Sequence, residues 1–303
     1  MLGNSFRATM ISRINIYVKA LRLYSFPCPV APVLVCAALV QKAGPPLNAG
    51  DVLLLLIGVC ALFFGANLVN DYYDYKKGVD TAASIGSSGV LVQGLLTPRQ
   101  VRAGYMFLYA AACAIGLYFI AIRGLPLLLL LCAGICGGYM YTGGPYALKY
   151  YGLGEPLVFC LMGPLLFTAL HNALTGMYSL QNFLLSIPCG LLCTADLTAN
   201  NLRDHAQDVR AGIRTIVTVL GFAGARAVFT FLIIAPFVFI ALLVWRELFS
   251  AGLLLSLGAL PAAIIVLAPV WKKNPDDRLK TLVQRAFGLQ LFFSLLTLVG
   301  ILW

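Results

Sequence analysis

Nine long apolar stretches follow one another along the 303 residues of this chain, with short polar segments between them. A helix that crosses a membrane needs roughly 20 mostly apolar residues. Hydrophobic residues make up 61% of the sequence and charged residues 11%, whereas a soluble domain carries roughly 25% charged residues. The sequence therefore predicts an all-α integral membrane protein with nine transmembrane helices. The predicted spans are 24–42, 52–70, 104–122, 125–142, 153–174, 181–199, 217–244, 249–270 and 283–302.

The basic residues are divided unequally between the two sides that nine spans would create. Of the 21 Lys and Arg residues, only Lys42, Arg123 and Arg246 fall on the side opposite the N-terminus. Cytoplasmic loops carry the excess of Lys and Arg in membrane proteins, so the N-terminus is predicted to be cytoplasmic. The formal net charge of +10 is then explained by topology and by anionic lipid head groups, and nucleic-acid binding is not expected.

Eight of the 11 acidic residues gather on the same side as most of the basic ones. Only Asp51 and Glu247 lie opposite, and Asp196 falls inside the sixth predicted span. So few acids, collected at one face, indicate a one-sided polar site. An acid within a membrane span is costly and is a candidate functional residue, although Asp196 could also be satisfied locally within its helix.

The first polar motif follows the second predicted span. Asn67 and Asp71 are four residues apart, as are Asn70 and Asp74, and Asp80 comes shortly after. Side chains three or four residues apart share one face of a helix. Carboxylates held so close repel one another unless a cation neutralises them. Carboxylate and amide oxygens suit Mg²⁺, which is usually held by one or two carboxylates together with substrate phosphates.

The second motif follows the sixth predicted span, four spans later. Asn200, Asp204 and Asp208 form a stripe with a spacing of four residues. Two such stripes facing each other would hold two Mg²⁺ ions with a diphosphate between them, a site between internal repeats. Nearby cations would neutralise the remaining phosphate charge, namely Lys77, Lys149, Arg203 and Arg214. The alternative is that these acids only cap helices or solvate loops.

On these motifs the chain resembles the UbiA superfamily of intramembrane prenyltransferases. The family pattern is matched by Asn70-Asp71-x-x-Asp74 after the second span and by Asp204-x-x-x-Asp208 after the sixth. Within the superfamily the chain is most similar to the 1,4-dihydroxy-2-naphthoate polyprenyltransferase branch. That similarity rests on segments 67–80, 86–96, 139–155 and 200–215 and on Arg22-x-x-x-Phe26-Pro27. One departure is Gly78, which stands where the commoner pattern has a further Asp, with Asp80 two residues later.

The resemblance covers the whole chain and implies one UbiA-type domain, residues 1–303, in a bacterial cytoplasmic membrane. It implies transfer of a polyprenyl group from a polyprenyl diphosphate to an aromatic acceptor, with Mg²⁺ as cofactor. The acceptor of this branch is 1,4-dihydroxy-2-naphthoate, and the product is demethylmenaquinone. The expected catalytic residues are Asp71, Asp74, Asp204 and Asp208, which with Asn67 and Asn200 are also the expected metal ligands. The expected substrate-binding residues are Arg22, Asn67, Asn70, Lys77, Asp80, Tyr141, Lys149, Asn200, Asn201, Arg203 and Arg214.

Two individual roles and two alternatives complete these expectations. Lys149 is expected to bind diphosphate oxygens, and Arg22 to pair with the carboxylate of the acceptor. Within the same class, the acceptor could instead be 4-hydroxybenzoate, homogentisate or a tetrapyrrole. In another class, paired Asp and Asn clusters also suit a cation-coupled transporter. Transporter sites lie near the middle of the bilayer, whereas these motifs lie at the ends of spans, which favours the enzyme.

Overall fold

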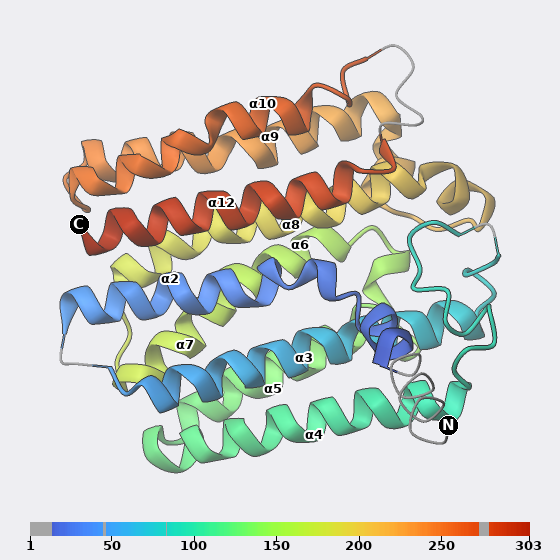
Figure 1. The fold of residues 1–303 in the computed structure, drawn as a ribbon, viewed down its shortest axis with the longest axis horizontal. Helices are drawn as coiled ribbons and strands as arrows, with labels where there is room; N and C mark the ends of the chain where they lie inside the picture. The colour runs from blue at the N-terminus through green and yellow to red at the C-terminus, as the bar shows by residue number, and fades with distance from the viewer. Residues whose placement is uncertain (1–13, 45–46, 83, 273–278) are drawn as a thin grey trace, which may run out of the picture.

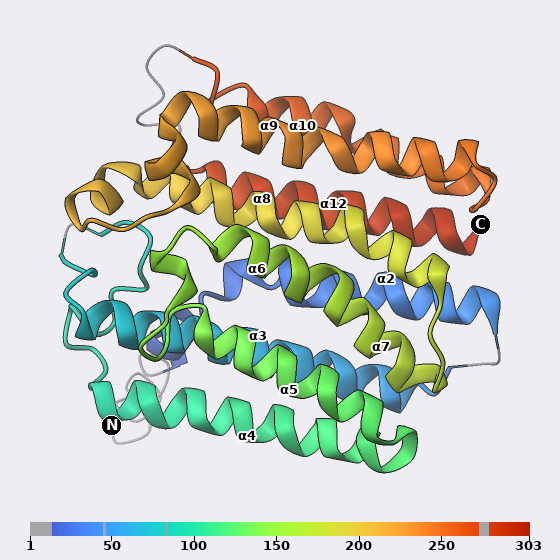
Figure 2. The same cartoon turned by 180° about the vertical axis from the view of Figure 1, so that it is seen from behind.

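The computed structural model describes residues 14–44, 47–82, 84–272 and 279–303, and the chain there is almost entirely helical. The long helices run side by side in a bundle (Figures 1 and 2). Seven segments of the described chain are long and apolar enough, by length and composition, to cross a membrane. Five of them are single helices: α3 (Ala49–Lys76), α4 (Pro98–Arg123), α8 (Leu180–Arg210), α9 (Ile216–Trp245) and α12 (Leu282–Leu302). The sixth, Leu23–Ala43, consists of η1 (Leu23–Ser25) and α2 (Pro27–Ala43). The seventh, Gly154–Thr175, consists of α6 (Gly154–Cys160), η3 (Leu161–Leu165) and α7 (Leu166–Thr175).

Two of the nine predicted spans are shorter in the structure. One is α5 (Leu125–Met140), and the other is Ala251–Leu267, formed by η4 (Ala251–Ala259) and α10 (Leu260–Leu267). Helix α5 ends early because Gly143-Gly144-Pro145 follows it, and Gly144 adopts a left-handed φ of 74°. Both segments lie alongside the long helices (Figure 1). The all-helical membrane fold is thus confirmed, whereas the count of nine transmembrane helices is not.

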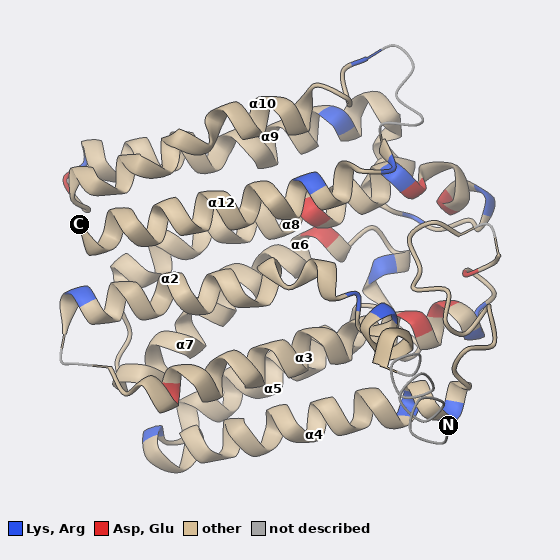
Figure 3. Cartoon of the chain, in the orientation of Figure 1, with Lys and Arg blue, Asp and Glu red and all other residues tan. Residues whose placement is uncertain are grey.

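Most of both polar motifs lies on helices, and Asp80 follows the end of α3. Helix α3 has 28 residues and continues to Lys76, and α8 has 31 residues and continues to Arg210. Each motif therefore occupies the last turns of its helix. The two helices end at the same end of the bundle, where most of the charged residues gather (Figure 3). The opposite end carries few charges, as the sequence predicted.

The span formed by α6, η3 and α7 is pressed closely against α8. Its middle section, Leu161–Leu165, is a π-helical turn that contains Pro164, whose missing N–H favours such a change of register. A Cβ atom on Gly190 of α8 would lie only 3.0 Å from the Cα atom of Gly163. This contact fixes two walls of the cavity described below.

Candidate active site

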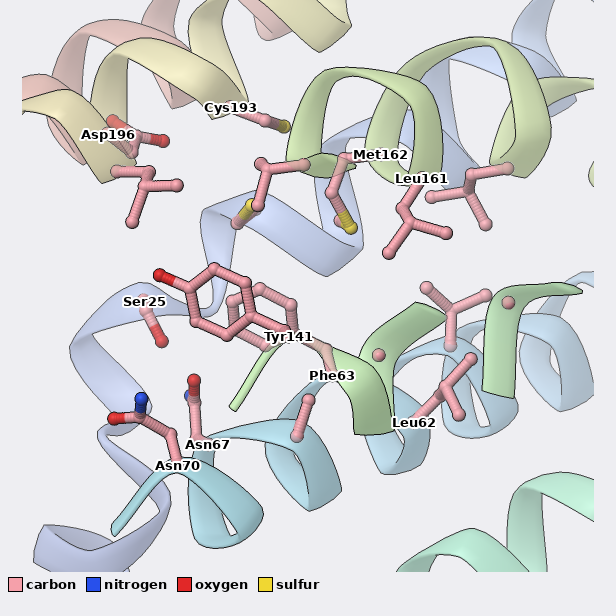
Figure 4. A pocket seen from close by; sticks show the side chains of 18 of the residues that line it. Ser25, Leu62, Phe63, Asn67, Asn70, Tyr141, Leu161, Met162, Cys193 and Asp196 are labelled. Atoms are coloured by element: carbon pink, nitrogen blue, oxygen red, sulfur yellow. The ribbon is translucent and has the colours of Figure 1, made fainter. Parts of the chain in front are cut away.

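A cavity of about 330 Å³ lies between α3, α4, α5, the α6–α7 span and α8. Asn70 and Leu55 both line it from α3, and they are 15 residues apart, so the cavity follows the helix for about 22 Å. Polar side chains line the end near the motifs, and apolar side chains line the rest (Figure 4). The cavity therefore joins a charged surface site to an oily interior.

Most of the residues predicted from the sequence line the polar end of this cavity. They come from elements far apart in the chain, because the ends of α3 and α8 and two connecting segments meet there. The predicted residues on the cavity wall are Arg22, Asn67, Asn70, Asp74, Asp80, Tyr141, Lys149, Asn200, Asn201, Asp204 and Asp208.

Asp71 does not line the cavity. Its neighbours Asn70 and Asp74 do, but successive helical residues point about 100° apart. The Asp71 carboxylate is 2% exposed and accepts hydrogen bonds from Arg22 and from the Ser88 hydroxyl. Arg22 also donates to the Asn70 side chain at 3.2 Å. Asp71 thus holds a cation at the cavity wall, and the structure does not place it among the lining oxygens.

Arg22 has a left-handed backbone, with φ of 54°, in the turn before η1. This conformation is uncommon for residues other than glycine, and such strain persists where the surroundings fix it. Here the guanidinium is fixed by its ion pair with Asp71.

Asp74 is bound by two groups from the segment between α5 and α6. The Lys149 ammonium lies 2.6 Å from its carboxylate, and the Tyr150 hydroxyl donates a hydrogen bond to it. Burial alone would lower the pKa of Lys149, but the Asp74 carboxylate raises it, so the pKa lies above its usual range. Burial and the same carboxylate raise the pKa of Tyr150. Lys149 is therefore a fixed positive charge at the polar end of the cavity.

The stripe on α8 lines the cavity as predicted, with Asn200, Asp204 and Asp208 on one wall. Arg203 donates to Asp204 through two bonds of 2.8 Å and to the Asn200 side chain at 2.9 Å. Asn201 holds the buried Glu155 through a bond of 2.6 Å. The second motif thus has its own cation, as Asp71 on α3 has Arg22.

Besides Asp71, three predicted residues lie off the cavity. Lys77 is exposed, and its ammonium lies 4.1 Å from the centre of the Tyr150 ring. Arg203 lines a separate hollow on the other side of α8. Arg214 is exposed, and its backbone forms a β-bridge with Tyr151. None of the three is among the residues on the wall of the main cavity, so phosphate binding by them remains a prediction.

Residues 79–82 and 84–88, between α3 and α4, lie over the polar end of the cavity, a placement that the sequence did not predict. Ser88 of this segment bonds to Asp71, and Gln207 of α8 donates to the Val79 carbonyl at 3.1 Å and to the Ser84 hydroxyl at 2.7 Å. A Cβ atom on Gly86 would lie 2.0 Å from an Asp204 oxygen. Ser88 and Gly86 belong to a Gly-Ser-Ser-Gly run that carried the resemblance, but the sequence offers no signal for Gln207.

The oxygen atoms at the polar end suit Mg²⁺ in kind. Carboxylates and amides from both motifs face one cavity, and Mg²⁺ prefers such hard oxygen ligands, completed by water and substrate phosphates. In the part of the chain that the structure describes, no three His, Cys, Asp or Glu side chains form a group that could hold a metal. The donor set fits an ion held jointly by the protein and a diphosphate.

Asp80 is expected to make stability depend on pH. Burial, together with the Asp74 and Asp71 carboxylates, raises the pKa of Asp80 from 3.8 to about 7. Between about pH 4 and pH 7 the folded protein then binds more protons than the unfolded chain, so its stability falls as pH rises through this window. Asp80→Asn should flatten this slope in thermal unfolding of the purified protein in buffer free of divalent cations. An unchanged slope in the variant would show that Asp80 ionises normally.

Residues 30–296 match the UbiA prenyltransferase family. UbiA prenyltransferase domain-containing protein 1 from Gallus gallus is 31% identical over 289 residues, which cover 94% of this chain and 84% of that protein. The 1,4-dihydroxy-2-naphthoate octaprenyltransferase of Bacillus subtilis is 32% identical over 173 residues, which cover 57% and 56% of the two chains.

Solved structures agree with these matches at the level of the fold. The structure of a UbiA homolog from Archaeoglobus fulgidus bound to GPP and Mg²⁺ has a TM-score of 0.69 at 16% identity. The similarity covers 94% of this chain and 99% of that chain. The Gallus gallus relative matches 94% of this chain and the Bacillus subtilis naphthoate enzyme only 57%, so the naphthoate branch and a bacterial source are not established.

Proposed function

This chain belongs to the UbiA prenyltransferase family, and from that premise we propose that it transfers a polyprenyl group from a polyprenyl diphosphate to an aromatic acceptor. One observation carries the proposal. A single cavity, which follows α3 for about 22 Å, has carboxylates, amides and fixed cations at one end and apolar walls along the rest of its length. A polyprenyl diphosphate has a charged diphosphate that suits the polar end and an apolar chain that suits the apolar walls.

The polar end is suited to bind the diphosphate. Lys149 and Arg22 line it and are held in place by Asp74 and Asp71. The Lys149 charge would face the phosphate oxygens, and the Arg22 charge lies at the same polar end, where the acceptor's carboxylate would pair with it. Bound Mg²⁺, held by Asp74, Asp204, Asp208 and the side-chain oxygens of Asn67 and Asn200, would supply Lewis-acid stabilisation of the departing diphosphate.

The apolar walls are suited to protect the allylic carbon while it carries positive charge. Leu62, Phe63, Leu161 and Met162 line the cavity next to its polar end (Figure 4), and such walls exclude the water that would hydrolyse the cation. The Tyr141 ring projects into the same space, where its face could stabilise a cation. The aromatic acceptor would then attack the allylic carbon and lose a proton.

The acceptor that we propose is 1,4-dihydroxy-2-naphthoate, whose carboxyl group would leave as CO2. The product would be the quinol form of demethylmenaquinone, which an oxidant outside this reaction converts to the quinone. The support is the partial similarity to the Bacillus subtilis octaprenyltransferase and the shared sequence segments. The Archaeoglobus fulgidus structure, whose fold is similar, was solved with GPP and Mg²⁺, which supports a prenyl diphosphate as donor and Mg²⁺ as cofactor. A cation-coupled transporter fits the cavity less well, because the apolar walls of the cavity cannot coordinate a hydrated ion.

We also propose that all nine apolar segments span the membrane, with the N-terminus cytoplasmic, in a single domain. Helix α5 has 16 residues and is about 24 Å long. The segment Ala251–Leu267 is partly 3₁₀-helical, and the larger rise of that helix extends it to about 30 Å, the thickness of the hydrocarbon core. The charge asymmetry in Figure 3 supports this orientation.

Arg22 tests how the two substrates share the polar end. If Arg22 pairs with the acceptor's carboxylate, Arg22→Ala should raise the KM for dihydroxynaphthoate more than the KM for the prenyl diphosphate. If Arg22, held at the polar end by Asp71, instead binds the diphosphate, only the KM for the prenyl diphosphate should rise. Steady-state kinetics with each substrate varied in turn decide between the two, and the second result would assign Arg22 to the diphosphate.

Product analysis tests the proposed function. Purified protein, Mg²⁺ and geranylgeranyl diphosphate should be incubated with an equal mixture of dihydroxynaphthoate, 4-hydroxybenzoate and homogentisate. Mass spectrometry should show the prenylated, decarboxylated naphthoate product as the main species. Prenylation of another acceptor alone would overturn the branch and keep the family activity.

A further inference from the structure

Asp196 is a buried carboxyl group that faces the cavity without a partner. It lies on α8 and is 3% exposed, and it belongs to the cavity wall. In the part of the chain that the structure describes, neither of its carboxyl oxygens has a hydrogen-bond partner. Glu155, another buried acid at this end of the bundle, is instead bound by Asn201 at 2.6 Å. A buried polar group that the protein leaves unpaired costs free energy.

The described residues around Asp196 do not compensate for this cost with a hydrogen bond to its carboxyl group. The titratable groups that face it are the thiols of Cys193 and Cys28, and Cys193 already accepts a hydrogen bond from Gln290 at 2.9 Å. The remaining neighbours on this part of the wall include Met162 and Leu161, which are apolar (Figure 4). Among the described residues no ion pair with Asp196 is formed, whereas Lys149 pairs with Asp74. The carboxyl group is therefore available to a ligand in the cavity.

The depth of Asp196 separates it from the proposed diphosphate site. It is eight residues before Asp204 on the same helix, which places it about 12 Å farther along the axis. Because Mg²⁺–oxygen bonds are about 2 Å long, one ion cannot bind both carboxylates. Figure 4 shows Asp196 on one wall, Asn67 and Asn70 on the opposite wall, and the Tyr141 ring between them.

We infer that Asp196 binds a hydroxyl group of the aromatic acceptor and so positions the acceptor ring beside the prenyl carbon that leaves the diphosphate. The inference rests on the proposed function. A phenolic O–H would donate to a carboxyl oxygen that has no other partner, in a space with little water to compete. The hydrogen bond fixes which face and edge of the ring meets the prenyl carbon.

Kinetics of Asp196→Leu and Asp196→Asn test this role. We expect the Leu variant to raise the KM for dihydroxynaphthoate at least about tenfold, with a change of less than about twofold in the KM for geranylgeranyl diphosphate. The Asn variant keeps a hydrogen-bonding oxygen, so its KM for dihydroxynaphthoate should rise less than that of the Leu variant. Thr198→Val is the matched control, because Thr198 is fully buried on the same helix, bonds to the Thr194 carbonyl and lies off the cavity wall.

A pair of probes tests the hydrogen bond itself. Inhibition constants should be measured for 1-naphthol and for 1-methoxynaphthalene, which cannot donate the bond. Wild-type protein should bind 1-naphthol more tightly by at least about fivefold, and the Leu variant should bind the two within about twofold of each other. Equal discrimination in both proteins would overturn the inference, because the hydroxyl would then bind elsewhere.

Thermal unfolding separates this role from a structural one. Replacing an unpaired buried carboxyl by Leu should leave Tm unchanged or raise it, whereas loss of a structural group would lower Tm and both substrate affinities together. An unchanged acceptor KM in a folded, active Leu variant would also overturn the inference. If wild-type protein prenylates no aromatic acceptor at all, it is the proposed function that fails, and this is visible before any variant is made.

Discussion

Replacing Asp71 or Asp204 by alanine should lower kcat/KM for prenyl transfer at least about a hundredfold, or about 2.7 kcal/mol of barrier. Asp204 lines the cavity on α8 and would contribute an oxygen to Mg²⁺. Asp71 holds Arg22, so its loss leaves a half-buried cation at the cavity wall without its carboxylate partner. Steady-state kinetics on the purified variants, with both substrates varied, measure the effect.

Asp51→Ala is the matched control for these variants. Asp51 lies in the first turn of the same helix as Asp71, at the opposite end of the bundle, and its recorded partner is the Tyr118 hydroxyl at 3.3 Å. We expect its activity to stay within about twofold of wild type. If Asp71→Ala and Asp204→Ala behave like this control, the acidic motifs are structural and the proposed site is wrong.

Lys149→Ala should have the second largest effect and should act on one substrate. Lys149 lies at the polar end of the cavity with its ammonium 2.6 Å from Asp74. Its removal withdraws a positive charge from the diphosphate and leaves Asp74 without its cation. The KM for geranylgeranyl diphosphate should rise at least about tenfold, and the acceptor KM should change little.

Two further variants make the Lys149 result specific. Lys149→Arg keeps the charge and should recover most of the affinity. Lys76→Ala removes a charge from an exposed position at the end of α3, off the cavity wall, and should change neither KM. Equal losses for both substrates in Lys149→Ala would point to a collapse of the polar end, and no loss would show that the diphosphate binds without Lys149.

The parts of the site that follow helical periodicity could be predicted from the sequence. Asn200, Asp204 and Asp208 share a face because α8 continues through them. The four-residue spacing groups Asp71 with Asn67 on one face of α3. In the structure, however, the cavity is lined by Asn67, Asn70 and Asp74, and Asp71 points away from it. Choosing between two adjacent stripes requires the position of the neighbouring helices.

Contacts between distant segments could not be predicted in the same way. Arg22 reaches Asp71 across 49 positions through a left-handed turn, and Gln207 reaches Val79 across 128. No periodic pattern encodes such contacts. Composition likewise predicted nine spans without showing that α5 stops at 16 residues or that part of Ala251–Leu267 is a 3₁₀-helix. Asp196 was identified as unusual from its place inside an apolar span, but only the structure shows that its carboxyl oxygens have no hydrogen-bond partner among the described residues.

Removal and return of Mg²⁺ test the central claim most directly. Purified protein should be stripped of divalent cations with EDTA and assayed with geranylgeranyl diphosphate and dihydroxynaphthoate, with prenylated product and released diphosphate measured together. We predict that product formation falls below detection and returns when excess Mg²⁺ is added, with one diphosphate released for each product molecule. Undiminished prenyl transfer in EDTA would contradict the account, because the oxygen-rich end of the cavity would then have no metal to hold.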